Sequence, residues 1–306
     1  MSIDLIEKIK LRRSVRFLYE IQKLRISTAQ RGDKRIRGGE AILIPEEEMK
    51  FFMEAAGRLE QLECDTEKEV KKVLKGIPIW ENWLKRQKGI GPRLGGVIIS
   101  EFDITKCNTI SAMWSYAGLA VVDGKAAHFK RGEKGGYNPW LKAKILKVLG
   151  DSFMKSNSPW RKFYDDYKHR KQNQLVNVCM ACSGKGKVKY KKNKFGEEEL
   201  IGGVSAKEES VKTDERKRNR YSSILSRSTF KVVVGEESGR IAICANCKGT
   251  GGPTCWGKSD KHRHNAAIRY MAKQFLSALW LEWRNMENLP IRVPYAEEYL
   301  NRKHHE

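Results

Sequence analysis

The chain has 306 residues, 40% of them hydrophobic, and carries 60 Lys and Arg against 37 Asp and Glu, giving a formal net charge of +23. This excess of positive charge points to a polyanionic partner and makes a nucleic acid the expected ligand. Because no apolar run approaches the roughly 20 residues that span a bilayer and the first residues lack a signal-peptide core, we expect a cytoplasmic protein, nucleoid-associated or active in a phage-infected cell, with no membrane partner.

Two helices are expected in residues 1–76, which we assign to an N-terminal domain. Apolar residues recur at helical spacing from Ile3 to about Leu24. The basic side chains of this helix could face either a phosphate backbone or solvent: Arg12, Arg13, Arg16, Lys23 and Arg25. Residues 28–40 are glycine-rich and predict a flexible loop. Pro45 then begins a long acidic helix, whose apolar stripe favours a structural or self-association role and makes a homodimer a candidate assembly.

A tight turn, Gly89-Ile90-Gly91-Pro92, joins two short predicted helices in residues 79–101. Its glycines can adopt positive φ, and its proline suits the first position of the second helix. Amide groups at that helix start, together with the helix dipole, favour a phosphate. We therefore predict a helix-hairpin-helix motif that grips a nucleic-acid backbone, with an ordinary capped turn as the alternative. The contacts are assigned to Lys85, Lys88, Gly89, Gly91 and Arg93.

Residues 102–172 predict further helices and one basic loop. Asn108 is an expected helix cap, and residues 121–134 predict a turn or short hairpin. This segment carries three more phosphate-contact candidates, Lys130, Arg131 and Lys134. Asn138-Pro139 and Ser158-Pro159 each place a cap before a proline and so predict two more helix starts. The second of these helices holds the one acidic cluster that we retain as a candidate catalytic group, Asp165 and Asp166 beside His169.

Several of these blocks occur in an order that resembles a known family. The glycine-proline turn at 89–92, Glu101, the YAGL block at 116–119 and the KRG block at 130–132 are followed by Phe163-Tyr164. This order is similar to the C-terminal domain of DEDD-type insertion-sequence transposases and Piv-type DNA invertases, over residues 77–172 and 262–285. The resemblance implies a nucleic-acid-binding helical fold. Because some members of the family bind a guide RNA, RNA is the alternative ligand to DNA.

The chain departs from this family at both parts of its catalytic machinery. The family carries an N-terminal RuvC-like domain with four acidic residues, for which about 76 residues are too few. It also carries a serine nucleophile between the YAGL and KRG blocks, where this chain has AVVDGKAAHF. We therefore expect a phage-borne or mobile-element relative that binds DNA, duplex or branched, without recombinase chemistry. A metal-dependent nuclease or recombinase, or a guide-RNA-binding transposase relative, is the alternative.

Two copies of CxxCxGxG, at residues 179–186 and 244–251, predict a metal site. Each copy places two thiolates on a tight turn whose glycines leave amide groups free to face sulfur. Four thiolates suit a tetrahedral structural zinc ion, held by Cys179, Cys182, Cys244 and Cys247. The motif resembles the zinc-binding repeats of DnaJ-type chaperones and rubredoxin-like knuckles. Cys255, His262 and His264 lie close by and could replace a ligand or build a second site, although His-Arg-His at a helix start is more typical of a basic surface.

Between the cysteine pairs, residues 187–195 and 228–243 alternate as strands do, around a polar and mobile middle. After them, residues 261–286 predict a helix with one apolar face: Ile268, Met271, Phe275, Leu279, Trp280 and Trp283. The sequence thus predicts a mainly α fold. A helix-hairpin-helix domain covers 77–172 and 256–288, a zinc-bound β-ribbon is inserted at 173–255, and residues 289–306 form a tail.

Overall fold

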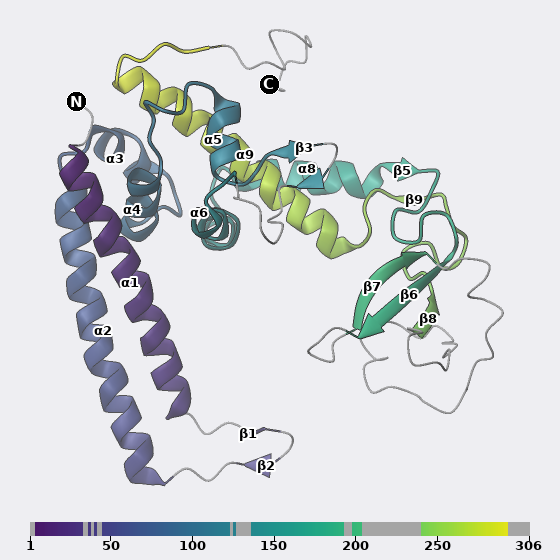
Figure 1. The fold of residues 1–306 in the computed structure, drawn as a ribbon, viewed down its shortest axis with the longest axis horizontal. Helices are drawn as coiled ribbons and strands as arrows, with labels where there is room; N and C mark the ends of the chain where they lie inside the picture. Colours follow the sequence, from purple (N-terminus) through teal and green to yellow (C-terminus); the bar gives the residue numbers. More distant parts are fainter. Residues whose placement is uncertain are drawn as a thin grey trace. The chain divides into compact units, whose positions relative to one another are not determined.

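The computed structural model describes residues 4–32, 36–37, 40–41, 45–122, 125–126, 136–192, 198–203 and 240–292. The fold is mainly helical, as predicted, with small antiparallel sheets. The chain forms two compact units (Figure 1). Unit one comprises Met1–Arg161 and Met271–Glu306, and unit two comprises Lys162–Tyr270.

In unit one the helices are α1 (Leu5–Arg31), α2 (Glu46–Leu74), α3 (Pro78–Asn82), α4 (Pro92–Glu101), α5 (Ile110–Tyr116), α6 (Pro139–Ala143), α7 (Gly150–Lys155) and the part of α9 (Asp260–Met286) that begins at Met271. A 3-10 turn, η1 (Leu84–Arg86), follows α3, and a π-helical segment, η2 (Lys144–Leu149), joins α6 to α7. Two short antiparallel pairs complete the unit: β1 (Ile36–Arg37) with β2 (Glu40–Ala41), and β3 (Val121–Val122) with β4 (Lys125–Ala126).

Helices α1 and α2 run side by side in opposite directions (Figure 1). Helix α1 buries Leu11, Val15 and Leu18 at helical spacing. It continues seven residues beyond the predicted end near Leu24, so the expectation of a loop from residue 28 was wrong at its start. Thr28, in the last turn of α1, is buried, as a residue of a packed helix is and a residue of a flexible loop is not.

Helix α4 is the buried centre of this unit, since each of its residues from Leu94 to its end is buried. Its two glycines permit this. A Cβ at Gly96 would lie 2.7 Å from Val15 of α1 and 3.3 Å from Val70 of α2. A Cβ at Gly95 would overlap the Trp80 ring. Helices α1, α2 and α4 therefore pack together within unit one, and the expected boundary at residue 76 falls inside it.

The predicted helix starts at Pro92 and Pro139 are confirmed, and the Asn138 side chain accepts a hydrogen bond from the Leu141 amide at 3.0 Å. The predicted cap at Asn108 was wrong by one residue, because the Thr109 hydroxyl caps α5 instead. Residues 139–155 bury Leu141, Ile145, Leu149 and Phe153, although a π-helical segment interrupts the α-helix. The predicted helix at 261–286 is α9 (Asp260–Met286), and its six predicted apolar residues are buried.

Unit two holds α8 (Arg161–Asn173), the first part of α9 and two small sheets. One sheet pairs β5 (Leu175–Val176) with β9 (Thr254–Cys255). The other has the order β7-β6-β8, from β6 (Lys187–Lys192), β7 (Glu198–Gly203) and β8 (Arg240–Ile243). Strands β6 and β8 confirm the described parts of both predicted strands, whereas β7 was not predicted. In the part of the chain that the structure describes, no helix combines the length and apolar character needed to cross a membrane.

Candidate metal centre and nucleic-acid interface

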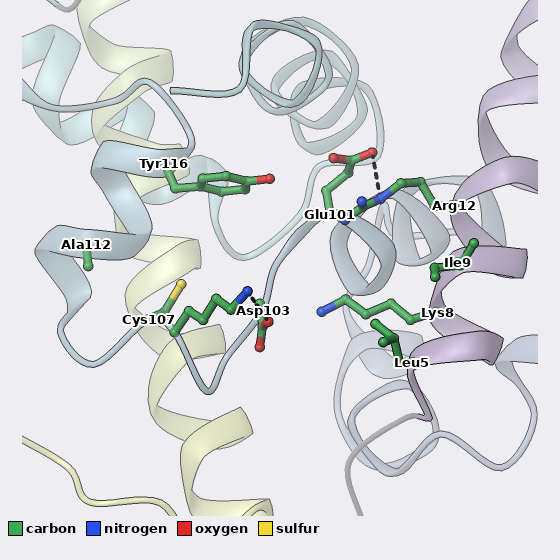
Figure 2. Close-up of a pocket in the computed structure, with 10 residues that line it drawn as sticks. Leu5, Lys8, Ile9, Arg12, Glu101, Asp103, Cys107, Ala112 and Tyr116 are labelled. Carbon is green, nitrogen blue, oxygen red and sulfur yellow. Dashed lines mark ion pairs between the residues drawn. The ribbon is translucent and has the colours of Figure 1, made fainter. Parts of the chain in front are cut away.

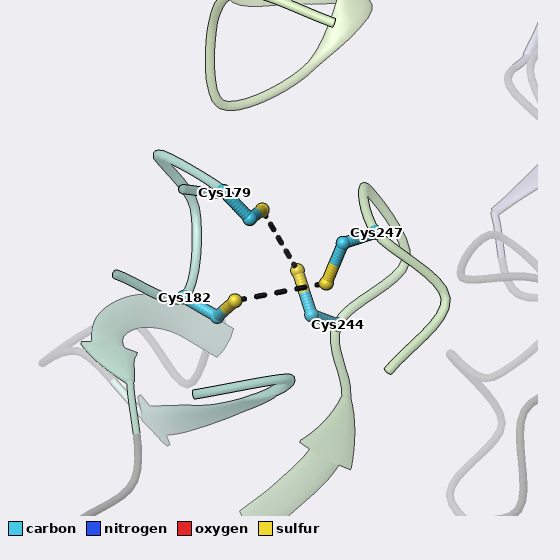
Figure 3. A group of neighbouring side chains, drawn as sticks. All are labelled: Cys179, Cys182, Cys244 and Cys247. Carbon is cyan, nitrogen blue, oxygen red and sulfur yellow. Dashed lines mark hydrogen bonds between the residues drawn. The ribbon is translucent and has the colours of Figure 1, made fainter. Parts of the chain in front are cut away.

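Four buried cysteines of unit two gather at the base of the β6–β8 pair (Figure 3). Their sulfur atoms all lie within 4.8 Å of one another. The Cys179 and Cys244 sulfurs are 3.7 Å apart, as are those of Cys182 and Cys247. All four thiols are free, and a disulfide requires a sulfur–sulfur distance near 2 Å. The predicted gathering of these residues is confirmed, and it forms a candidate site for a metal ion.

The two knuckles are related residue by residue at an offset of 65 positions. The Cys179 amide donates to the Gly251 carbonyl at 2.7 Å, and the Cys244 amide donates to the Gly186 carbonyl at 2.8 Å. The Gly186 amide points at the Cys182 sulfur at 3.2 Å, and the Gly251 amide points at the Cys247 sulfur at 3.3 Å. The knuckles therefore hold each other in register and direct amide hydrogens at sulfur.

The glycines of the repeat are required by this mutual packing. Gly186 and Gly251 have φ of +72° and +78°, a region that other residues rarely adopt. A Cβ at Gly186 would lie 2.2 Å from the Gly249 carbonyl oxygen, and a Cβ at Gly251 would lie 2.2 Å from the Gly184 oxygen. Each glycine of one knuckle thus makes room for the backbone of the other.

The environment of Cys179 favours its thiolate. Burial by itself would raise the pKa of this thiol, but nearby backbone amides and the Asn246 side chain lower its pKa to about 7. The Asn246 amide lies 3.5 Å from the Cys179 sulfur and is oriented by a 3.0 Å hydrogen bond to the Gly257 carbonyl. A thiolate is the form of cysteine that binds a metal.

The three nearby candidate ligands have other contacts. Cys255 lies in β9 and is outside the four-cysteine group. His262 stacks on Trp256, and its Nδ1 accepts a hydrogen bond from the Lys258 amide at 3.2 Å. His264 shares a 2.7 Å hydrogen bond with the Tyr164 hydroxyl. Among the described residues, the four cysteines are therefore the grouping suited to a metal.

In unit one, the turn at residues 89–92 places its two glycines in different surroundings. Gly89 has φ of +97°, and a Cβ there would lie 2.7 Å from the Ser156 hydroxyl. Gly91 has φ of −95°, so the expectation of positive φ holds for Gly89 alone. Gly91 is exposed, and nothing lies within 4 Å of the place that its Cβ would take. The fold thus requires glycine at residue 89 but not at residue 91.

The cations around this turn also differ in their surroundings: two are exposed, and one is bound by acids of the same unit. Lys85 and Lys88 are exposed, and Lys85 is 2.9 Å from Glu81. Arg93 instead turns toward α2, where it donates to Glu63 and Glu67. Lys130, Arg131 and Lys134 lie outside the described residues. The assignment of these side chains to phosphate contacts stays a prediction, but Arg93 has an internal role that the sequence pattern did not suggest.

Two buried carboxylates hold α1 in place, and the sequence reasoning missed both. Glu63 of α2 accepts hydrogen bonds from Arg25 and Arg93. Burial alone would raise the pKa of Glu63, but these two guanidinium groups lower it below its usual value. The signal was present in the sequence, because Glu63 stands midway between Ala56 and Val70 at seven-residue spacing in the buried stripe of α2.

The second carboxylate, Glu101, ends α4 beside a cavity of about 400 Å³ (Figure 2). Its side chain is 1% exposed and accepts from Arg16 at 2.9 Å and from Asn138 at 2.7 Å. Arg12 donates to the neighbouring Ser100 carbonyl at 2.7 Å. Cys107 also lines the cavity, where burial raises its pKa to about 11 and so disfavours the reactive thiolate. Three of the five basic residues predicted on α1 are thus bound internally.

The candidate catalytic cluster lies on α8. Asp165, Asp166 and His169 are all exposed, and the His169 ring contacts the Asn173 side chain at 3.0 Å. Within the described ranges these three side chains do not gather into a group that could hold a metal. Their catalytic assignment therefore stays a prediction.

Comparisons of the chain with protein-family models, with curated proteins and with solved structures find no match.

Proposed function

We propose that this protein is a zinc-stapled nucleic-acid-binding protein that contacts the phosphate backbone of duplex or branched DNA. In this proposal unit one grips the backbone at the 89–92 turn, and the four cysteines of unit two hold a structural zinc ion. The protein is related to the C-terminal domain of insertion-sequence transposases but performs no recombinase chemistry. The net charge of +23 supports a polyanionic ligand. The contact point is assigned to the turn because Gly91 is exposed and the packing of the fold does not require glycine there.

Zinc is supported by the chemistry and spacing of the four donors. A zinc ion bonded to four sulfurs at about 2.3 Å gives a tetrahedron with edges of about 3.8 Å. Two sulfur pairs already stand at 3.7 Å, and none exceeds 4.8 Å. Four protein thiolates leave no open coordination position, so the ion would stabilise the fold and would not activate a substrate.

The phosphate contact is supported by the surroundings of the turn. Helix α4 has ten residues and begins at Pro92, which has no amide hydrogen, so the Arg93 and Leu94 amides are the ones left to donate to an anion. Glycine at an extended position with open space around it allows a ligand to approach the backbone closely. Among the described residues Lys88 has no ion-pair partner, and it lies exposed directly before the turn.

A shallow groove extends this surface from the turn along α7. The Ser152 hydroxyl donates to the Gly89 carbonyl and joins the groove wall to the turn. Two exposed lysines, Lys147 and Lys155, line the groove with one acid, Asp151. The groove has a volume of about 610 Å³. A phosphate backbone lying on the turn could continue across these lysines, and each neutralised phosphate would release a counterion.

Replacing Gly91 with alanine should leave the fold intact and weaken DNA binding. The new methyl group meets no protein atom, so the stability should change by less than about 1 kcal/mol. It would stand where a phosphate approaches, and we expect about three- to tenfold weaker binding to a labelled duplex.

Lys88→Gln should weaken duplex binding by a similar factor and lower the slope of log affinity against log salt by about 0.9. Fluorescence anisotropy of the full-length protein measures both effects.

Gly57→Ala is the matched control, since Gly57 of α2 also has nothing within 4 Å of its Cβ position. Unchanged binding by Gly91→Ala, or equal loss by Gly57→Ala, would contradict the assignment of the turn.

Titrations with a four-way junction of the same arm sequence test the branched-DNA part of the proposal. We expect the junction to bind more tightly than linear duplex, and equal affinity would reject that preference.

A further inference from the structure

Unit two carries two stacked ring pairs on α8, the loop after β9 and the start of α9. Tyr167 and Tyr270 stack with centroids 4.8 Å apart and planes 27° apart. Trp256 and His262 stack at 5.3 Å and 17°. The Lys171 ammonium lies 4.8 Å from the Trp256 ring and 5.7 Å from the Tyr167 ring, so one cation contacts both ring pairs.

Among the described residues, three cations of this cluster, Arg170, Lys171 and Arg269, have no acidic partner. Arg170 lies over both tyrosine rings, at 5.4 and 5.9 Å from their centroids. Lys171 donates to the neutral side chain of Gln174 at 2.7 Å. Asp260 is the acidic residue in the part of α9 that belongs to unit two, and it already forms ion pairs with Lys168 at 3.6 Å and with Arg263 at 3.8 Å.

Arg269 gives an independent sign of a missing anion. Its Nη1 atom is buried and has no hydrogen-bond partner among the described residues. Burial lowers the pKa of this guanidinium, and the nearby Tyr167 side chain partly opposes that shift. A buried guanidinium donor without an acceptor is costly, and a bound anion would remove that cost. Across its described residues, unit two holds fifteen Lys and Arg against five Asp and Glu.

Rings and unpartnered cations in one cluster fit an unpaired nucleic-acid strand better than a duplex. In a duplex both faces of each base are covered by neighbouring bases, and the phosphates need only cations. In a single strand the base faces are free to stack on Tyr, Trp or His, while the phosphates reach nearby cations. The long Lys and Arg side chains over the rings can turn to the phosphates when a base takes their place.

We propose that this cluster binds unpaired nucleotides of a DNA or RNA strand, with Tyr167, Trp256 and Tyr270 against the bases and Arg170, Lys171 and Arg269 on the phosphates. The inference rests on the proposed function only in that the protein binds nucleic acid, because the site lies in the other unit from the 89–92 turn. It adds a second class of substrate, a single-stranded segment, to a protein whose turn contacts a backbone.

The test is an anisotropy titration of the full-length, zinc-loaded protein with three labelled probes of equal length: single-stranded DNA, single-stranded RNA and duplex DNA. The double variant Lys171→Gln with Arg269→Gln should bind its preferred single strand about tenfold more weakly and bind duplex within about twofold of wild type. The matched control is Lys185→Gln with Lys248→Gln, which removes the same charge from two exposed knuckle positions of the same unit and should change neither binding.

A ring substitution tests stacking apart from charge. Tyr270→Leu should weaken single-strand binding about fivefold or more, whereas Tyr270→Phe should retain it. Zinc content and melting temperature of each variant show whether it folds, and the charge variant carries the test if the leucine variant does not fold. Preferred binding of either DNA or RNA single strand, lost in the cluster variants alone, supports the proposal.

Three outcomes overturn the inference: single-strand binding that the cluster variants leave unchanged, an equal loss in the Lys185/Lys248 control, or an equal loss of duplex binding. Lys88→Gln separates this result from the proposed function. It should weaken duplex binding and leave single-strand binding unchanged. If duplex binding is absent in wild type while single-strand binding depends on the cluster, the turn assignment fails and this inference stands.

Discussion

Cys247→Ser should abolish stoichiometric zinc binding and unfold the knuckle region of unit two. Among the described residues, the buried cluster around the four sulfurs contains three other residues, Ala181, Val188 and Ala242, and such a small apolar core cannot by itself hold this region together. A structural zinc ion supplies about 10–16 kcal/mol of apparent binding free energy in small zinc domains at pH 7, and that energy is folding energy. Elemental analysis of the purified protein, together with limited proteolysis, measures both effects.

Cys255→Ser is the matched control. Cys255 lies in the same unit but outside the four-cysteine group, so its variant should keep one zinc ion per chain and resist protease as wild type does. Full zinc content in Cys247→Ser would show that Cys247 is not a ligand. Loss of zinc in Cys255→Ser alone would move the fourth ligand from Cys247 to Cys255.

Glu63→Gln should lower the free energy of unfolding of unit one by about 2–4 kcal/mol. The Glu63 side chain is 4% exposed and joins Arg25 of α1 to Arg93 of α4, so its neutralisation removes the charged partner of Arg25 and leaves Arg93 with Glu67. The estimate is below that for a fully buried pair because both arginines are more than a quarter exposed and keep some hydration. Urea unfolding monitored by circular dichroism measures the loss.

The effect of Glu63 should also depend on pH, with a defined sign. Because the pKa of Glu63 is lower in the folded state than in the unfolded chain, its stabilisation is fully present above the unfolded pKa near 4.3. It is lost as pH falls through the folded pKa. The stability difference between wild type and Glu63→Gln should therefore shrink below about pH 4.

Glu60→Gln controls for the loss of one charge from α2. Glu60 is exposed one turn before Glu63, and its replacement should change the stability by less than about 0.5 kcal/mol. Equal effects of the two substitutions, or a difference from wild type that stays constant down to pH 3, would contradict the role assigned to Glu63.

The sequence predicted those elements that depend on neighbouring residues alone. Helix starts at Pro92 and Pro139 follow from the preferences of proline and its cap, and the buried face of α9 follows from helical periodicity. The candidate metal site could be predicted equally well, since the two CxxCxGxG repeats identify its four cysteines and their glycines without knowledge of the fold. The structure adds that the two repeats pack against each other, with Gly186 of the first repeat and Gly251 of the second each lying against the backbone of the other repeat.

What the sequence did not predict depends on contacts between distant residues. Arg93 looked like a phosphate ligand because it follows a glycine turn, yet its partners are Glu63 and Glu67, thirty and twenty-six positions earlier. Glu63 belongs to the acidic helix predicted from Pro45 onward, yet its carboxylate is buried and accepts from arginines of two other elements. A charge on a helix can face solvent, ligand or another helix, and helical spacing alone does not distinguish the last two.

The affinity of the full-length protein for a labelled DNA duplex, measured by anisotropy at several salt concentrations, tests nucleic-acid binding most directly. We expect saturable binding at about 50 mM salt, and an affinity that falls by at least about a hundredfold by 200 mM, since several phosphates would be neutralised together. Absence of saturable binding to duplex, junction and single strands at the lowest salt, or an affinity that does not change with salt, would contradict a phosphate-gripping function.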